Sequence, residues 1–175
     1  MLGKGSGFRC QFLKGALRSG WRCLVLNKAF SLVELLIVVA IVATLGAIGV
    51  PLYTSYMDKA RASQAIANIV DMESIITRFR LERGFPPNSL GDVGLAGRVD
   101  PWGRAYEYLR IEGLSKADMD AKARTDRFIK PINSDFDLYS KGKDGDTQQN
   151  LNGSKSHDDI VRANNGAFIG KASDF

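Results

Sequence analysis

The 175-residue sequence predicts an α+β protein in which one long N-terminal helix packs on a small antiparallel sheet. Three observations lead to this fold class. An apolar run covers residues 32–50, an amphipathic helical pattern continues to Arg83, and the short segments 106–110 and 136–140 alternate as strands do. Because the long helix precedes all the strands, helix and sheet are segregated, as is typical of α+β domains.

The apolar run is long enough to cross a membrane. Only one threonine, two glycines and Glu34 interrupt it between Leu32 and Val50, and a bilayer core of about 30 Å needs about 20 such residues. We therefore expect a transmembrane helix over residues 30–53. A carboxylate within such a helix costs a few kcal/mol unless it meets a cation, so Glu34 either pairs inside the membrane or lies shallow enough to reach the headgroups.

The basic charge of the chain is confined to its start. Residues 1–29 contain six lysines and arginines and no acid, and subtracting these six charges from the net +5 leaves −1 for the rest. The sequence therefore gives no argument for nucleic-acid binding. The basic flank predicts a cytoplasmic N-terminus. Both cysteines, Cys10 and Cys23, also lie in residues 1–29, so we expect no disulfide in the chain that follows.

A second helical segment, residues 54–83, follows the apolar run. Its predicted inner stripe has three- and four-residue spacings and consists of Ile66, Ile69, Val70, Glu73, Ile76 and Phe79. Gly84 to Pro87 should end the helix. The prediction is one helix of about 80 Å from Phe30 to Arg83, whose first half lies in lipid and whose second half packs on a domain formed by residues 84–175.

The domain begins with loops and turns. A turn from Asp100 to Arg104 precedes the first predicted strand, and we expect Trp102 within it to be a core or turn anchor. Between the two strands, Ser115 should cap a short helix that ends at Lys122 or Arg124. The segment from Ser115 to Asn133 is either a lineage-specific decoration or a contact surface for a neighbouring subunit.

A polar, glycine-rich loop follows the second strand. Asp144, Asp146, Asp158 and Asp159 supply the oxygen ligands that calcium prefers, but their spacing excludes an EF-hand, and a solvated turn has the same composition. His157 is the only histidine, and we expect it to be a solvated side chain rather than a general base. With no phosphate-binding loop and no nucleophile elbow in the sequence, we predict that the chain is not an enzyme.

The residues from Lys28 to Glu34, followed by the long apolar run to Pro51, strongly resemble the N-terminal signature of type IV prepilins and of type II secretion pseudopilins. The resemblance implies that a membrane peptidase cuts between Ala29 and Phe30 and methylates the new amine of Phe30. Glu34 would then neutralise the amine of a neighbouring subunit. Ala29 departs from the usual glycine. The leader is long for this class, so we also consider a translation start at Leu24, Val25 or Leu26.

The domain also resembles one member of that group. Residues 85–87, 100–104 and 136–140 together are similar to the major pseudopilin of the type II secretion system. This implies a structural subunit of a short periplasmic fibre that drives protein export. Its implied partners are other copies of itself, minor pseudopilins, the prepilin peptidase and methyltransferase, the inner-membrane assembly platform and the membrane. The implied location is the bacterial inner membrane, with a single pass and a periplasmic domain.

The resemblance further implies a calcium ion (Ca²⁺) in the C-terminal loop. The matching ligands are the carboxylates of Asp144 and Asp159, the carbonyl of Leu138 and the hydroxyl of Ser140. Calcium would then clamp a polar loop that has no disulfide, with a stabilisation of about 2.7 kcal/mol at a hundredfold excess over its dissociation constant.

Two alternatives remain at this point. One is a true type IV pilus subunit for adhesion, motility or DNA uptake. The other is a monomeric, membrane-anchored calcium-binding module that forms no fibre. Glu34→Ala separates fibre from anchor, because crosslinkable oligomers should disappear only if Glu34 pairs with a neighbouring terminus.

Overall fold

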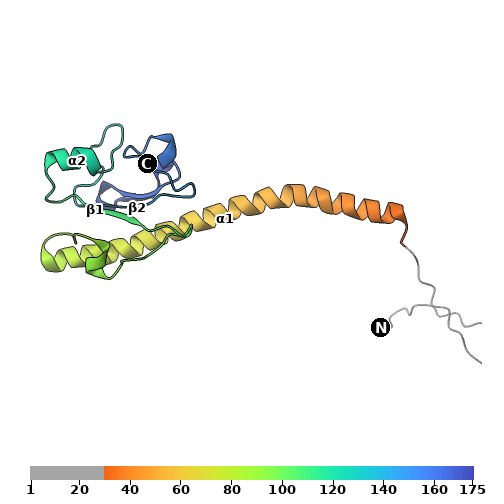
Figure 1. Ribbon diagram of the computed structural model, residues 1–175, viewed down its shortest axis with the longest axis horizontal. Helices are drawn as coiled ribbons and strands as arrows, with labels where there is room; N and C mark the ends of the chain where they lie inside the picture. The colour runs from red at the N-terminus through yellow and green to blue at the C-terminus, as the bar shows by residue number, and fades with distance from the viewer. Residues whose placement is uncertain (1–29) are drawn as a thin grey trace, which may run out of the picture. The chain divides into compact units, whose positions relative to one another are not determined.

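The computed structural model describes residues 30–175 and has the predicted α+β architecture (Figure 1). The chain divides into two compact units, one that ends at Gly49 and one from Val50 to Phe175, and the long helix contributes to both. In chain order the helices and strands are α1 (Leu32–Arg83), β1 (Glu107–Arg110), α2 (Lys116–Lys122), β2 (Phe136–Ser140), β3 (Ile160–Ala163) and β4 (Phe168–Lys171).

Four antiparallel strands form one sheet in the order β1-β2-β3-β4. The register places Tyr108 opposite Leu138, and Tyr139 opposite Val161. Both predicted strands are confirmed, since β2 has the predicted bounds and β1 begins one residue later than predicted. The strands β3 and β4 were not predicted. Each has only four residues, too few for a clear alternation of polar and apolar side chains.

The second half of α1 packs on one face of the sheet, where Figure 1 shows it alongside β1 and β2. Phe136, Leu138 and Ile160 supply the sheet side of this core. The helix side alternates three- and four-residue steps and consists of Ala62, Ala65, Ile69, Met72 and Ile76. Val70, predicted in this stripe, is 49% exposed because it follows Ile69 by one residue and therefore points about 100° away.

A second, smaller core covers the other face of the sheet. Val161 and Ala163 of β3 pack there with residues from the connecting segments, Ile132 and Leu151 among them. The segment that contains Ile132 also carries α2, whose start is capped as predicted, because the Ser115 Oγ accepts from the Asp118 N–H at 3.2 Å. The excursion between β1 and β2 is therefore folded onto the sheet.

Candidate functional site

The first half of α1 is an uncovered apolar helix. Every side chain from Phe30 to Gly49 is exposed in the single chain, including Leu36 at 63% and Ile37 at 54%. An 18-residue window of α1 has a mean hydropathy of 2.7, so by length and composition this helix could cross a membrane. Large apolar surfaces of this kind are sites of contact with lipid or with other protein.

Glu34 lies at the start of this helix and takes part in a reciprocal cap. The Ser31 hydroxyl accepts from the Glu34 N–H at 3.2 Å, and a Glu34 carboxylate oxygen accepts from the Ser31 N–H at 3.4 Å. This capping box satisfies two backbone donors, and the carboxylate also complements the positive end of the helix dipole. The pairing of Glu34 with a neighbouring amine involves two chains and stays a prediction. Ala29, the other side of the predicted cleavage site, lies outside the described residues, as do Cys10 and Cys23.

Asp159, a predicted calcium ligand, is completely buried just before β3. Its Oδ2 accepts from the Arg124 Nη2 at 2.5 Å and from the Thr147 hydroxyl at 2.5 Å. Its Oδ1 is buried without a hydrogen-bond partner among the described residues. Burial raises the pKa of Asp159, while the bonds from Thr147 and Arg124 act in the opposite direction. The carboxylate thus already faces a cation supplied by the chain.

Of the other three predicted ligands, the Ser140 hydroxyl and the Asp144 carboxylate have partners other than Asp159. Leu138 lies in β2 opposite Tyr108, with its side chain in the core. The Ser140 hydroxyl donates to the Asp100 Oδ2 at 2.5 Å. Asp144 is exposed, and its Oδ1 accepts from the Asp146 N–H at 2.8 Å. Within residues 30–175, no three His, Cys, Asp or Glu side chains lie close enough together to hold a metal ion. The calcium ion stays a prediction.

The predicted turn around Trp102 anchors the polar loop. Asp100 accepts from the N–H groups of Trp102 and Arg104, and Trp102 packs on the main core, which confirms it as an anchor. Arg104 in turn donates to the carbonyls of Gly142 and Lys143 at 2.7 and 3.3 Å. At Gly142 the backbone has a φ of +64°, and a Cβ atom would collide with Asp158. The loop is therefore fixed against the turn by direct bonds.

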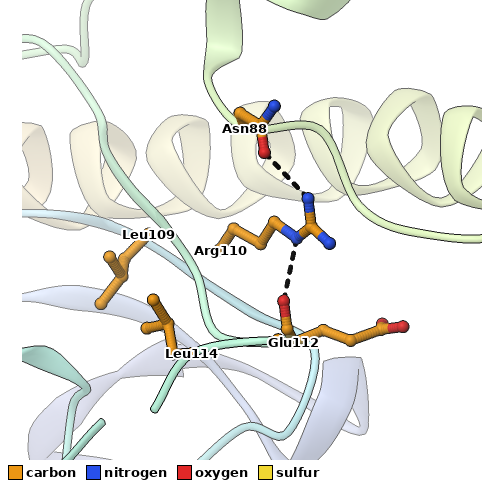
Figure 2. A pocket seen from close by; sticks show the side chains of 6 residues that line it. Asn88, Leu109, Arg110, Glu112 and Leu114 are labelled. Carbon is orange, nitrogen blue, oxygen red and sulfur yellow. Dashed lines mark hydrogen bonds between the residues drawn. The ribbon is translucent and has the colours of Figure 1, made fainter. Parts of the chain in front are cut away.

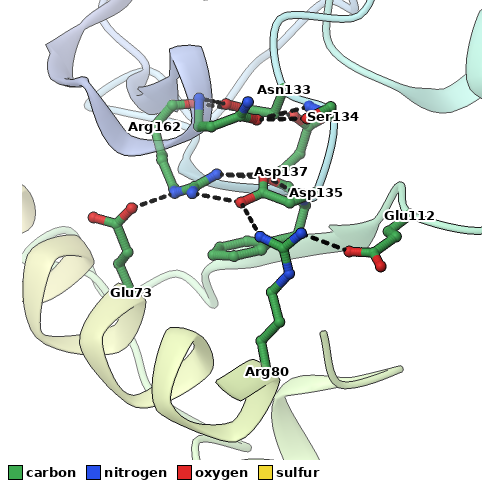
Figure 3. Close-up of polar contacts among 10 residues, drawn as sticks. Glu73, Arg80, Glu112, Asn133, Ser134, Asp135, Asp137 and Arg162 are labelled. Atoms are coloured by element: carbon green, nitrogen blue, oxygen red, sulfur yellow. Dashed lines mark hydrogen bonds and ion pairs between the residues drawn. The ribbon is translucent and has the colours of Figure 1, made fainter. Parts of the chain in front are cut away.

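A buried ion network fastens α1 to the sheet (Figure 3). Arg162 of β3 has a 2% exposed side chain and lies between Glu73 of α1 and Asp135. Its Nε donates to Glu73 at 2.6 Å, and both terminal nitrogens donate to Asp135 at 2.8 Å. Arg80, also on α1, lies 3.7 Å from Asp135 and 3.0 Å from Glu112. The paired charges offset the cost of burying a guanidinium.

Asp137 of β2 is a second buried carboxylate, and it links Asn133 to Arg124. It accepts from the Asn133 amide at 2.8 Å and from the Arg124 N–H at 2.7 Å. Burial raises the pKa of Asp137 to about 6, although these bonds and the nearby arginines act to lower it. This carboxylate therefore positions the chain at Arg124.

One surface pocket of about 380 Å³ lies beside β1, and Figure 2 shows Arg110 at its centre. Arg110 donates to the Asn88 side chain at 2.8 Å and to the Glu112 carbonyl at 2.9 Å. The lining contains neither histidine nor cysteine. His157 is exposed elsewhere, as expected of a solvated side chain. Glu112 is the one carboxylate of this lining, and it is paired with Arg80 at 3.0 Å.

Three residues that form the helix cap and the buried ion pairs were not predicted from the sequence. Ser31 could have been found, because a serine three residues before a glutamate at the start of an apolar run is the signature of a capping box. Arg124 and Arg162 gave no such signal. Their partners are 35 and 89 residues away, and only the fold brings them together.

An apolar helix that could cross a membrane, together with an α+β domain packed on the second half of the same helix, is the architecture of the pilin class. The chain is 32% identical to the fimbrial protein of Neisseria meningitidis serogroup A, over 69% of each chain. It is 31% identical to a type IV major pilin of Neisseria gonorrhoeae, over 69% of this chain and 71% of that one. The chain belongs to the type IV pilin family.

A relative of lower identity belongs to a secretion system. The type II secretion system core protein G of Aeromonas hydrophila is 27% identical, over 57% of this chain and 88% of its own length. No protein-family model and no solved structure matches the chain. The closer relatives are pilins, so the comparisons support the pilus alternative better than the predicted pseudopilin. They also agree with a structural, non-enzymatic role.

Proposed function

We propose that the chain is the structural subunit of a type IV pilus. The observation that carries this proposal is the head of α1, residues 32–49, whose apolar side chains are all exposed and require cover by lipid or by other copies. Identity of 31–32% to two pilins over about two thirds of the chain supports the fibre rather than a solitary anchor. Before assembly, the head would span the inner membrane with the domain outside the cytoplasm.

Maturation is part of this proposal. Cleavage between Ala29 and Phe30 by a prepilin peptidase would create a terminal amine, and the Glu34 carboxylate of the next subunit would neutralise it within lipid. A charge pair is favoured there because an isolated carboxylate costs a few kcal/mol. Edman sequencing or intact mass of the membrane-extracted protein should show a methylated Phe30 as its first residue. An N-terminus elsewhere would exclude this step.

The fibre is tested in the native host, deleted for the gene and complemented with wild-type protein, Glu34→Gln or Ser31→Ala. Glutamine at position 34 can still accept the Ser31 N–H, so Glu34→Gln removes the charge but keeps the cap. We expect a loss of at least tenfold in crosslinked oligomers and surface filaments for Glu34→Gln, since 1.4 kcal/mol corresponds to a factor of ten. Ser31→Ala is the matched control that keeps the charge. Oligomers undiminished in Glu34→Gln would refute the pairing.

A secretion pseudopilus is the second candidate, favoured by the match to 88% of the secretion protein G. The same strains distinguish the two functions. Immunogold-labelled filaments on the wild-type surface, lost on deletion while export is intact, support the pilus. Retention of normally secreted proteins in the periplasm of the deletion strain would instead support the pseudopilus.

A further inference from the structure

Arg124 and Asp159 form an ion pair in the interior of the domain. Their side chains are 4% and 0% exposed, and Nη2 lies 2.5 Å from Oδ2. A charged group buried this deeply is tolerated only with an opposite charge or a metal ion beside it. The carboxylate that the sequence assigned to calcium therefore has its compensating charge from an arginine.

The Arg124 guanidinium joins three parts of the chain. Its Nη1 donates to the Thr147 hydroxyl at 2.5 Å, and this hydroxyl donates to Asp159 at 2.5 Å. Its central carbon, Cζ, also lies 4.3 Å from the ring centre of Tyr139 in β2. One planar cation thus contacts the polar loop, the residue before β3 and the centre of the sheet, as a metal ion shared by several segments would.

The segment that carries Arg124 is held along the same loop. The Thr125 N–H donates to the Gln149 carbonyl and the Leu151 N–H donates to the Thr125 carbonyl, both at 2.9 Å. The Gln149 side chain donates back to the Ala123 carbonyl at 2.8 Å. The Arg124 N–H is itself bound by Asp137. Residues 115–133 therefore place the guanidinium through backbone bonds on both sides of Arg124.

These contacts do not fit a calcium ion at Asp159. Calcium takes six to eight oxygen ligands, whereas only the Asp159 Oδ1 remains unpaired here among the predicted carboxylate and hydroxyl ligands that are buried. A divalent ion on Oδ1 would share one carboxylate with a guanidinium, and two cations at that range repel strongly in a buried site. Asp144 is exposed, and Ser140 is bound to Asp100.

We propose that the Arg124 guanidinium is a built-in cation that holds the C-terminal loop closed without calcium, and that residues 115–133 are the arm that delivers it. This gives the arm a role inside its own subunit. The proposal concerns the stability of the domain and is independent of whether the chain forms a pilus or a pseudopilus.

The test is thermal unfolding of the full chain in mild detergent, in 1 mM calcium chloride and in EDTA. We expect the wild-type midpoint to differ by less than about 1 °C between the two. Arg124→Met should lower it by roughly 10 °C, since it leaves Asp159 buried and unpaired. Arg124→Lys keeps the charge but cannot contact both Asp159 and Thr147 as the two guanidinium nitrogens do, so its midpoint should fall between those of the wild type and Arg124→Met. Arg127→Met, an exposed arginine of the same segment, is the matched control with a shift below about 1 °C.

A midpoint raised several degrees by calcium in the wild-type chain, and not in Asp159→Asn, would overturn the proposal and establish the calcium site. This comparison does not use Arg124→Met, so it holds even if that variant does not fold. The double variant Arg124→Met with Asp159→Asn gives a second test. Its unfolding midpoint should drop clearly less than the sum of the two single drops, because each single variant already breaks the same ion pair. A drop equal to that sum would overturn the proposal.

Discussion

Ile37 and Ile69 are the same residue type in the same helix, yet Ile37 is 54% exposed and Ile69 is completely buried. The head of α1, residues 32–49, is almost wholly apolar and is not covered by any other segment within residues 30–175. The tail of α1, residues 50–83, is mixed in composition but buries one stripe of five residues against the sheet. Helix propensity is common to both halves and cannot explain their difference in exposure. The difference comes from the surface that each half contacts.

The two halves also handle charge differently. The tail brings Glu73 to a buried guanidinium, that of Arg162, whereas the only charge in the head is Glu34, whose carboxylate caps its own first turn. The buried stripe and Glu73 of the tail thus have their apolar and ionic partners in the same chain. The head has a surface whose partners must come from lipid or from other copies. Substitutions in the tail should therefore change folding, and those in the head should change assembly.

The largest effect on folding should come from Arg162→Met. The variant leaves Asp135 buried and Glu73 partly buried without their main partner, which should cost about 4 kcal/mol and lower the unfolding midpoint by roughly 10 °C. Arg78→Met, on the helix that carries Glu73, is the control. Arg78 pairs with Glu82 but is 81% exposed, so its loss should cost less than about 0.5 kcal/mol. Equal shifts for the two variants would mean that burial of the network has no bearing on stability.

The matched isoleucines provide the next test. Ile69→Ala should destabilise the domain by about 3 kcal/mol, because it removes buried methyl groups and leaves a cavity. Ile37→Ala makes the same chemical change at an exposed position and should leave the unfolding midpoint unchanged. Thermal unfolding in detergent measures both. If Ile37→Ala were as destabilising as Ile69→Ala, the head would have to pack within its own chain, and the contrast between the halves would fail.

Prediction from sequence succeeded where the signal is local. The apolar run, the end of α1 at Arg83, the cap at Ser115 and the strand from Phe136 to Ser140 each depend on neighbouring residues, and all are observed. The inner stripe of α1 was only partly predicted, since Ala62, Ala65 and Met72 were passed over in favour of larger or β-branched residues. The small side chains of Ala62 and Ala65 suit a close helix-to-sheet contact, and hydropathy alone undervalues them, whereas Met72 is large and was simply missed.

The rest depended on pairings between distant parts of the chain. No local pattern distinguishes the buried Arg124 and Arg162 from the exposed Arg78 and Arg127, because their partners come from other elements. The resemblance to pseudopilins predicted calcium ligands at Asp144 and Asp159 and could not anticipate a cation from the segment between β1 and β2. The same resemblance gave the family correctly, but the closer relatives are pilins. Loop residues were thus less predictable than the elements that hold them.

The smallest effect should come from Ser31→Ala, which removes the cap at the head of α1 and leaves the Glu34 charge in place. Loss of an N-cap costs about 1 kcal/mol, here confined to the first turn, because no described contact of the folded domain involves Ser31. Hydrogen exchange at the Glu34 and Leu35 amides should accelerate about fivefold in detergent, while the unfolding midpoint stays constant. Crosslinked oligomers should fall less than twofold. A loss as large as that of Glu34→Gln would mean that assembly depends on the geometry of the capped turn rather than on the charge of the carboxylate.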